Sequence, residues 1–174
     1  MRIVAGRFGG RRLTAPKGDA TRPTADRVRE ALFSVLGDVT GLTVLDLFAG
    51  SGALGIEALS RGAASAVFVE RAAPALAALH ANLDALGLAE EVHRGDARTF
   101  ARNASRAGRT YDLVFADPPY RDAERLAAEL DLGSLIAPGG RLVTESDRRA
   151  PFPTDLTIAF ERRYGDTLIR IHGH

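Results

Sequence analysis

The fold of this chain is decided by one stretch, Val44-Leu45-Asp46-Leu47-Phe48-Ala49-Gly50-Ser51-Gly52-Ala53-Leu54-Gly55. It begins as an apolar, β-branched run, which is typical of a strand buried on both faces. A glycine loop follows, and then the helical segment 53–60. In doubly wound α/β sheets, ligands bind where such a strand ends. The stretch therefore predicts a parallel sheet whose first strand covers residues 43–48, with a ligand site directly after that strand.

The rest of the chain continues the alternation of strands and helices. We expect further strands over residues 65–70, 90–94, 111–116 and 140–145, and helices over 74–86, 97–107 and 121–132. Two more strands, over 154–160 and 167–171, have no helix between them and are expected to form an antiparallel pair at one edge. The pattern predicts a Rossmann-like α/β fold, with a mostly parallel seven-stranded sheet and helices on both faces.

The first 23 residues have a different pattern from the rest. Residues 2–5 and 12–15 flank a turn region containing Gly9-Gly10, which predicts a β-hairpin. A linker without periodicity follows, and Thr24 can cap a helix over 25–36. At 174 residues the chain is long enough for one domain. We therefore assign residues 1–23 to a hairpin and linker, and residues 24–174 to the α/β domain.

Positive charge is concentrated at the start of the chain. Residues 1–29 hold eight basic groups against two acidic ones, whereas the remaining residues hold 15 basic and 20 acidic groups. Such an asymmetry predicts contact with a polyanion such as nucleic acid, although Arg stands in place of Lys almost everywhere in this sequence. Phosphate contacts are expected from Arg7, Arg11, Arg12, Lys17 and Arg22. Of the two arginines on the following helix, Arg27 and Arg29, one can instead pair with an acidic neighbour.

Several classes of protein are excluded or disfavoured by composition. The sequence has no Cys, so disulfides, thiolate metal sites and cysteine nucleophiles are excluded. No apolar run of about 18 residues or signal peptide is present, so we expect a cytoplasmic protein. The four His residues have no metal-ligand spacing, and no metal is expected. His172 and His174 are expected to fray as a short C-terminal tail.

Acidic residues follow successive predicted strands. Gly50 to Gly55 matches the dinucleotide pattern G-x-G-x-x-G, so a nicotinamide-dependent enzyme stays open at this point. Asp46, however, would repel a pyrophosphate. Glu70 is placed to bind ribose hydroxyls, and Asp96 could accept from the amine of adenine. A ligand with ribose, adenine and a positive charge but no phosphate is S-adenosylmethionine.

The fourth predicted strand ends in Asp117-Pro118-Pro119-Tyr120, the most specific signal in the chain. Two prolines fix the backbone and remove two donors, so their carbonyls are held in a rigid bend. The Asp side chain and a fixed carbonyl can accept hydrogen bonds from an amine, and Tyr120 offers a face on which a base can stack. The segment suits the exocyclic amine of a nucleobase that has left its stack.

The stretch 44–52 resembles motif I of the class I S-adenosylmethionine-dependent methyltransferases. The resemblance implies that the cofactor, which leaves as S-adenosylhomocysteine, is bound by residues of the glycine loop and of the next two strand ends. These residues are Asp46, Phe48, Ala49, Gly50, Ser51, Gly52, Glu70, Arg71, Asp96 and Ala97.

Residues 117–120 resemble the (Asp/Asn/Ser)-Pro-Pro-(Tyr/Phe/Trp) motif of methyltransferases that act on adenine N6, cytosine N4 or guanine N2. The resemblance makes Asp117, Pro118, Pro119 and Tyr120 the catalytic residues.

The chain as a whole is similar to the RsmD family, bacterial enzymes that methylate N2 of a guanine in 16S ribosomal RNA (nucleotide 966 in the reference numbering). The residues that carry this likeness, besides motif I and 117–120, are 2–6, 9–13, 21–24 and 27–33. The family's substrate is an assembly particle of the small ribosomal subunit, and its hairpin contacts RNA. RNA-binding residues would then be Arg7, Arg11, Arg12, Lys17, Arg22, Thr24 and Arg27.

Three alternatives to this function are weighed. A DNA adenine-N6 methyltransferase, or an enzyme for another RNA base, would share residues 117–120, but DNA enzymes usually carry a target-recognition insertion that has no room here. A nicotinamide-dependent dehydrogenase would use the glycine loop. An assembly factor that binds RNA without catalysis is disfavoured by the intact motif. Nothing in the sequence demands a dimer, so a monomer is expected. Ser146 and Arg148 either reach the site or cap the fifth strand.

Overall fold

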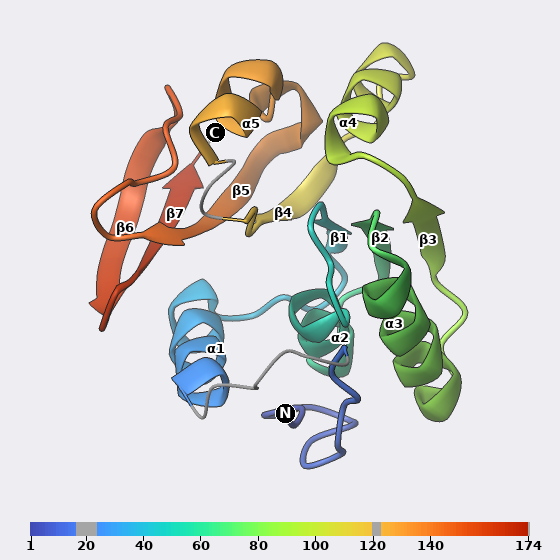
Figure 1. Cartoon of the computed structure of the whole chain (residues 1–174). Helices are drawn as coiled ribbons and strands as arrows, with labels where there is room; N and C mark the ends of the chain where they lie inside the picture. Colours follow the sequence, from blue (N-terminus) through green and yellow to red (C-terminus); the bar gives the residue numbers. More distant parts are fainter. Residues whose placement is uncertain (17–23, 120–122, 174) are drawn as a thin grey trace.

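The computed structural model describes residues 1–16, 24–119 and 123–173. Strands in these ranges form one seven-stranded sheet in the order β3-β2-β1-β4-β5-β7-β6 (Figure 1). The strands are β1 (Thr43–Asp46), β2 (Ser65–Glu70), β3 (Glu91–Arg94), β4 (Tyr111–Ala116), β5 (Ile136–Asp147), β6 (Thr157–Tyr164) and β7 (Thr167–Gly173). The first five run parallel, whereas β7 is antiparallel to both of its neighbours, β5 and β6. The predicted fold class is confirmed.

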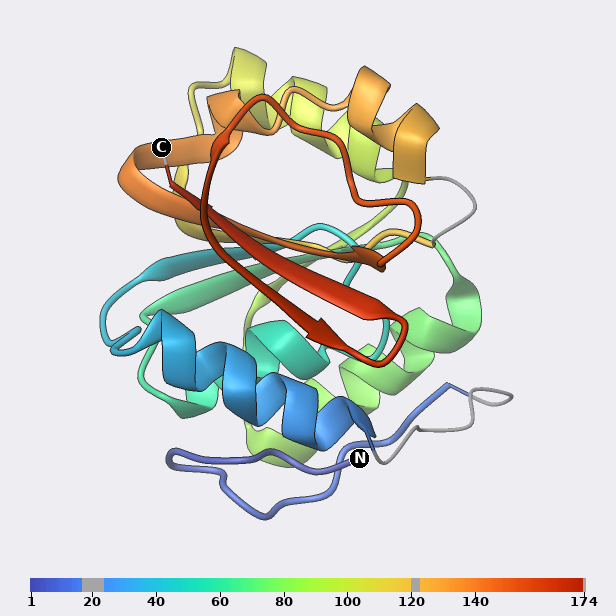
Figure 2. The ribbon, with the colours of Figure 1, turned by 90° about the vertical axis from the view of Figure 1, so that its left-hand side faces the viewer.

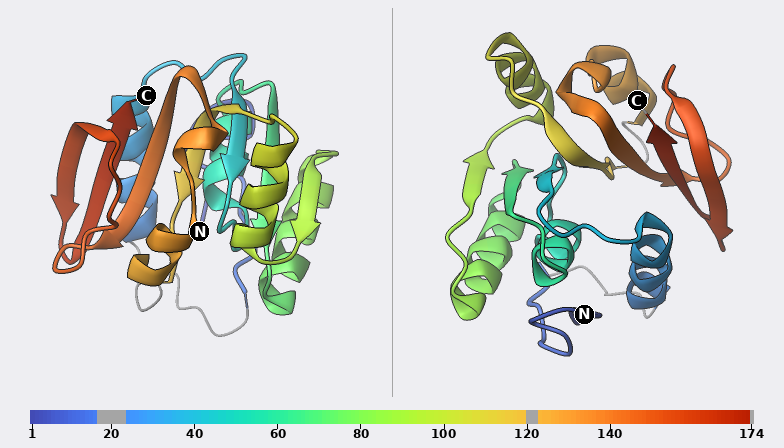
Figure 3. Two further views of the ribbon diagram at one scale, coloured as in Figure 1. Left: turned by 90° about the horizontal axis from the view of Figure 1, so that it is seen from above. Right: turned by 180° about the vertical axis from the view of Figure 1, so that it is seen from behind.

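Helices cover both faces of the sheet (Figures 2 and 3). One face carries α1 (Thr24–Leu36), α2 (Ala53–Ser60), α3 (Ala73–Leu86) and the N-terminal residues, and the other carries α4 (Ala97–Arg106) and α5 (Ala123–Glu129). Each face has its own apolar cluster. Phe33, Phe68 and Phe115 lie in the first cluster, and Val69 and Leu142 in the second. Burial of both sheet faces accounts for the almost continuous apolar strands of the sequence.

Element boundaries differ from the predicted ones mainly in the second half of the chain. A 3₁₀ turn (Gly133–Leu135) leads directly into β5, which begins at residue 136 instead of 140. The register between β4 and β5 shifts near the start of the strand, which accommodates the residues that were predicted to be a loop. β1 is shorter than predicted, because the chain turns after Asp46 into the glycine loop.

The expectation that His172 frays is wrong. The residue belongs to β7, which lies between β5 and β6, and its side chain is fully buried. Its Nε2 lies 3.1 Å from Oγ1 of Thr144, and Nδ1 lies 3.4 Å from the carbonyl of Leu156. Burial lowers the pKa of His172. The C-terminal segment is therefore part of the sheet interior, which local sequence does not reveal.

The N-terminal hairpin is reduced to a single bridge between Arg2 and Arg12. The two arms are still antiparallel, since the amide of Ile3 donates to the carbonyl of Arg11 at 3.0 Å. Ile3 and Leu13 are buried in the core cluster beneath α1 and α2. We call residues 1–16 the N-terminal arm, and its packing makes it part of the body of the protein.

Gly6 and Gly10 provide a matched test of how tightly the arm is held. Both have a φ near +80°, which costs a non-glycine residue roughly 1–2 kcal/mol. A Cβ at Gly6 would lie 1.9 Å from the carbonyl oxygen of Ser60, whereas one at Gly10 would meet nothing within 4 Å. Gly6→Ala is expected to destabilise the protein by about 2 kcal/mol more than Gly10→Ala, measured by urea unfolding. Equal losses would contradict the close approach.

Candidate active site

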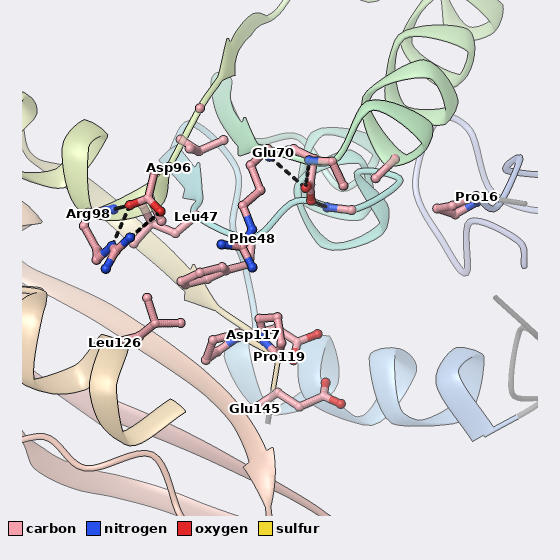
Figure 4. A pocket seen from close by; sticks show the side chains of 18 of the residues that line it. Pro16, Leu47, Phe48, Glu70, Asp96, Arg98, Asp117, Pro119, Leu126 and Glu145 are labelled. Carbon is pink, nitrogen blue, oxygen red and sulfur yellow. Dashed lines mark hydrogen bonds and ion pairs between the residues drawn. The ribbon is translucent and has the colours of Figure 1, made fainter. Parts of the chain in front are cut away.

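A cavity of about 770 Å³ opens at the carboxyl ends of the five parallel strands, β1 to β5 (Figure 4). It brings together many of the predicted residues. Those that line it are Phe48, Gly50, Glu70, Arg71, Asp96, Ala97, Asp117, Pro118 and Pro119. Tyr120 lies outside the described residues. Six of the ten predicted cofactor residues and three of the four residues of the predicted catalytic turn therefore share one cavity.

Four predicted cofactor residues do not line the cavity and instead build the glycine loop. They are Asp46, Ala49, Ser51 and Gly52. Oδ2 of Asp46, which is buried, accepts a hydrogen bond from the amide of Gly55 at 3.1 Å. The amide group of Asn82 donates to the carbonyl of Ser51 at 2.9 Å. These contacts hold the loop at the start of α2, so Gly50 can present its backbone to the cavity.

Asp46 sits in an environment that disfavours its charge. Burial, with a smaller contribution from the charge of Glu70, raises the pKa of Asp46 to about 7. An ionised carboxylate is destabilising there unless a positive charge is brought near it.

Glu70 is fixed by backbone donors at the end of β2. Its Oε2 accepts from the amide of Gly50 at 2.8 Å, and its Oε1 accepts from the amides of Arg71 and Ala72 at 2.8 and 2.7 Å. The side chain therefore ties the glycine loop to the start of α3. Oε1 already accepts two hydrogen bonds and Oε2 only one, so Oε2 can still accept a hydrogen bond from a ribose hydroxyl.

Asp96 is both a helix cap and an ion-pair partner. Its Oδ1 accepts from the amide of Arg98 at the start of α4, and its two oxygens lie 2.8 and 2.9 Å from the Arg98 guanidinium (Figure 4). Arg98 lowers the pKa of Asp96 to about 2. Arg98 also pairs with Glu129 at 2.6 Å, so the cap of α4 is joined to α5. An incoming amine would share Asp96 with Arg98.

Asp117 follows β4 and is only partly exposed. Burial, together with the carboxyls of Glu145 and Asp46, raises the pKa of Asp117 well above its usual range. Pro118 is buried and Pro119 exposed, so the turn leads from the interior to the mouth of the cavity. A carboxyl with raised proton affinity beside a rigid carbonyl is suited to orient an amine and to hold a proton.

Comparison with known proteins decides the family. A family model described as "Conserved hypothetical protein 95" matches residues 1–173. "Ribosomal RNA small subunit methyltransferase D" of Escherichia coli (strain K12) is 38% identical over 161 residues, which are 88% of this chain and 78% of that protein. The chain belongs to the RsmD family of methyltransferases. YlbH of Bacillus subtilis (strain 168) is 37% identical over 180 residues, 99% of this chain and 98% of that protein. The solved structure of yhhF from Escherichia coli matches with a TM-score of 0.85 at 34% identity, over 100% of this chain and 97% of that one.

Membership of the RsmD family resolves the ambiguity of the glycine loop. The match of Gly50 to Gly55 to the dinucleotide pattern does not make this chain a nicotinamide-dependent enzyme. Within the described ranges, no three His, Asp or Glu side chains are grouped to hold a metal ion, and no helix has the length and apolar character to cross a membrane.

The arm of this RsmD-family chain places its basic residues far from the cavity. The amide of Arg7 donates to the carbonyl of Ser60, the last residue of α2, and Arg11 donates to the carbonyl of Ala85 near the end of α3. Both helices begin at the cavity, so the tip of the arm lies roughly 12–20 Å from it, at 1.5 Å per residue. Arg7, Arg11 and Arg12 are exposed.

The other predicted RNA contacts divide into three cases. Arg27 is exposed in the first turn of α1. Arg29 is buried and pairs with Asp26 at 2.9 Å, so it is the structural one of the two helix arginines. Lys17 and Arg22 lie outside the described residues, as does the side chain of Thr24.

Several lining residues are missing from the sequence prediction. Arg98, Arg125 and Leu126 come from α4 and α5, and no local pattern marks them. Glu145, near the end of β5, could have been found, because it follows the same rule of strand-end acids that selected Asp117. Of the two residues left open beyond that strand, Ser146 is buried and Arg148 pairs with Asp166 at 3.1 Å, and neither lines the cavity.

Asp46→Asn should stabilise the protein in a pH-dependent way. A raised pKa means that stability is present at low pH and is lost as pH rises from about 4 to about 7. The variant is expected to be more stable than the wild type by about 1–3 kcal/mol at pH 8 and to differ little at pH 4, measured by urea unfolding.

Asp112→Asn on β4 is the control with the opposite sign. Hydrogen bonds from Thr43 lower the pKa of Asp112, so its ionised form contributes stability that is present at neutral pH and lost in acid. That variant is expected to be less stable than the wild type at pH 8. A gain for Asp46→Asn that is equal at both pH values would contradict this account of the buried carboxyl.

Proposed function

We propose that this RsmD-family chain transfers a methyl group from S-adenosylmethionine to the exocyclic N2 of a guanine, position 966, in 16S ribosomal RNA. The observation that carries the proposal is that one cavity holds both Asp117-Pro118-Pro119 and the acids Glu70 and Asp96. The name of the Escherichia coli relative supports a small-subunit RNA as substrate. The proposed setting is the small subunit or its assembly intermediate, in the cytoplasm, with the enzyme acting as a monomer.

The residues of the cavity fit S-adenosylmethionine. Glu70 has one acceptor position left for a ribose hydroxyl, Phe48 and Leu126 supply apolar surface, and Asp96 stands beside Ala97 where an adenine amine would be bound. The acids Asp46, Glu70 and Asp117 make the surroundings favourable for a positive charge. A cation in the cavity would stabilise ionised carboxylates and so offset the cost of burying them. S-adenosylmethionine supplies, when bound, an electrophilic methyl group on a sulfonium.

The turn after β4 prepares the amine to attack. The lone pair of an exocyclic amine is delocalised into the ring, so the nitrogen is a poor nucleophile until its N–H groups are polarised. The carboxylate of Asp117 and the carbonyl of Pro118 are the acceptors that the turn offers. In the transfer, a nitrogen–carbon bond forms, the sulfur–carbon bond breaks, and one amine proton is lost. Holding the amine in line supplies much of the acceleration.

The distance between the arm and the cavity favours a large, folded substrate. A base enters the cavity only after it leaves its stack. An RNA that also contacts Arg7 and Arg11 must extend roughly 12–20 Å along α2 and α3. A flexible short oligonucleotide loses conformational entropy when it makes both contacts, whereas a folded particle presents them together, so we expect a ribosomal particle to be methylated much faster than a naked short RNA.

The direct test uses labelled S-adenosylmethionine and small ribosomal subunits from cells that lack this gene. After incubation with the pure protein, the RNA is digested to nucleosides. We expect the label in N2-methylguanosine, with a loss of at least about 100-fold for Asp117→Ala, since a positioned acceptor commonly contributes 10²–10⁴-fold. Glu30→Ala, an exposed change on α1, serves as the matched control.

Label in another base would leave the methyltransferase family intact and overturn the assignment to guanine N2. Efficient turnover of a short naked oligonucleotide would contradict the role assigned to the arm. Cofactor binding without transfer to the subunit would direct the search to DNA, to other RNAs or to an earlier assembly particle.

Asp117 is expected to give the reaction a pH dependence. Because its pKa is raised, the carboxyl is protonated at low pH, and it becomes the stronger acceptor for the amine when it ionises. The single-turnover rate should therefore rise with pH and then reach a plateau. Asp117→Asn keeps an acceptor oxygen that does not titrate, so its rate should be lower but without that rise. An unchanged pH profile in the variant would assign the titration to another group.

A further inference from the structure

Glu145 stands beside the catalytic turn through the register of the sheet. β4 and β5 are parallel neighbours in which Ala116 pairs with Thr144. The residues that follow, Asp117 and Glu145, therefore lie next to each other, and both line the cavity. Figure 4 shows Glu145 close to Asp117 and Pro119, whereas Glu70 and Asp96 lie beyond Phe48. Glu145 thus belongs to the part of the cavity proposed for the base.

Two neighbouring carboxyls of this kind are unfavourable for the fold alone. Burial and the neighbouring charge of Glu145 both raise the pKa of Asp117. Groups of like charge in a cleft are typical of functional sites, where a ligand relieves the repulsion. The ligand suited to this pair is one that offers several hydrogen-bond donors side by side.

Guanine is such a ligand. Its N1–H and its 2-amino group are adjacent donors on one edge of the ring, and ionised carboxylates are acceptors only. Adenine and cytosine also carry exocyclic amines, but the ring nitrogen next to the amine is an acceptor in both. A carboxylate placed beside the amine-binding residue would attract the guanine edge and repel the other two. A buried polar contact of this kind discriminates strongly, because the wrong base leaves it unpaired.

We propose that Glu145 selects guanine by accepting a hydrogen bond from N1–H, while Asp117 and Pro118 hold the 2-amino group. The inference rests on the proposed function and adds to it the residue that determines the base. Glu145 acts as a specificity residue. It takes no part in the methyl transfer, in which the amine held at the Asp117 turn attacks the methyl group. In a Glu145→Gln variant, the carboxylate, which can only accept hydrogen bonds, is replaced by an amide, which can also donate them.

The test compares guanine with 2-aminopurine, which keeps the 2-amino group but has an acceptor at N1. Small subunits are reconstituted with 16S RNA that carries one or the other base at the target position, and single-turnover rates give the guanine/2-aminopurine ratio. For the wild type we expect a ratio of about 10–100, in the range of one good hydrogen-bonded base contact. For Glu145→Gln we expect slower methylation of guanine and a ratio at least about tenfold lower, because the Gln amide can donate to N1.

Asp147→Asn is the matched control, since Asp147 lies two residues further along β5 and does not line the cavity. Its ratio should equal that of the wild type, and calorimetric affinity for S-adenosylmethionine should be the same in all three proteins. A wild-type ratio near one, or a Glu145→Gln ratio equal to that of the wild type, would overturn the assignment of Glu145. The wild-type ratio can be measured even if a variant fails to fold. Failure of the proposed function is a separate result, in which the wild type makes no N2-methylguanosine at all.

Discussion

The carboxylate of Glu57 holds together three parts of the chain that are distant in sequence. It is fully buried in α2, and it accepts from the amides of Val4 and Ala5 at 2.7 and 3.0 Å. It also pairs with Arg61 at 2.7 Å and with Arg29 of α1 at 3.4 Å. A buried charge that loses one partner costs several kcal/mol, so these contacts form or fail together. Glu57 thereby ties the start of the arm, whose last residue Pro16 lines the cavity, to both α1 and α2.

The chemistry of the site follows from the parallel sheet, which delivers acidic residues from successive strands to one edge. Their surroundings then give them different proton affinities. Asp96 is held ionised by Arg98, whereas burial biases Asp46 and Asp117 toward the neutral form. The charge of Glu70 adds to this effect at Asp46, and the charges of Glu145 and Asp46 add to it at Asp117. One type of side chain can thus cap a helix, support a loop and face an amine, according to what lies within a few ångströms of it.

Local sequence predicted the strands and helices and the edge of the sheet at which the acids meet, because apolar periodicity and strand ends are local signals. It could not predict which strands become neighbours. His172 was misjudged for that reason, since β7 reaches the interior only by inserting between β5 and β6. For the same reason, the sequence does not predict that Glu145 lies next to Asp117. Nor does it predict that Asp46 supports the loop by accepting a hydrogen bond from Gly55 in the first turn of α2.

Both free edges of the sheet carry charged side chains. β3 has only four residues, of which Glu91 and Arg94 are exposed, and β6 exposes Glu161, Arg162 and Arg163. A strand edge offers unpaired backbone groups to any extended chain, and short, charged edges resist such additions. The short strand β3 and the charged half of β6 are therefore poor templates for aggregation in a protein proposed to work on unfinished ribosomal particles.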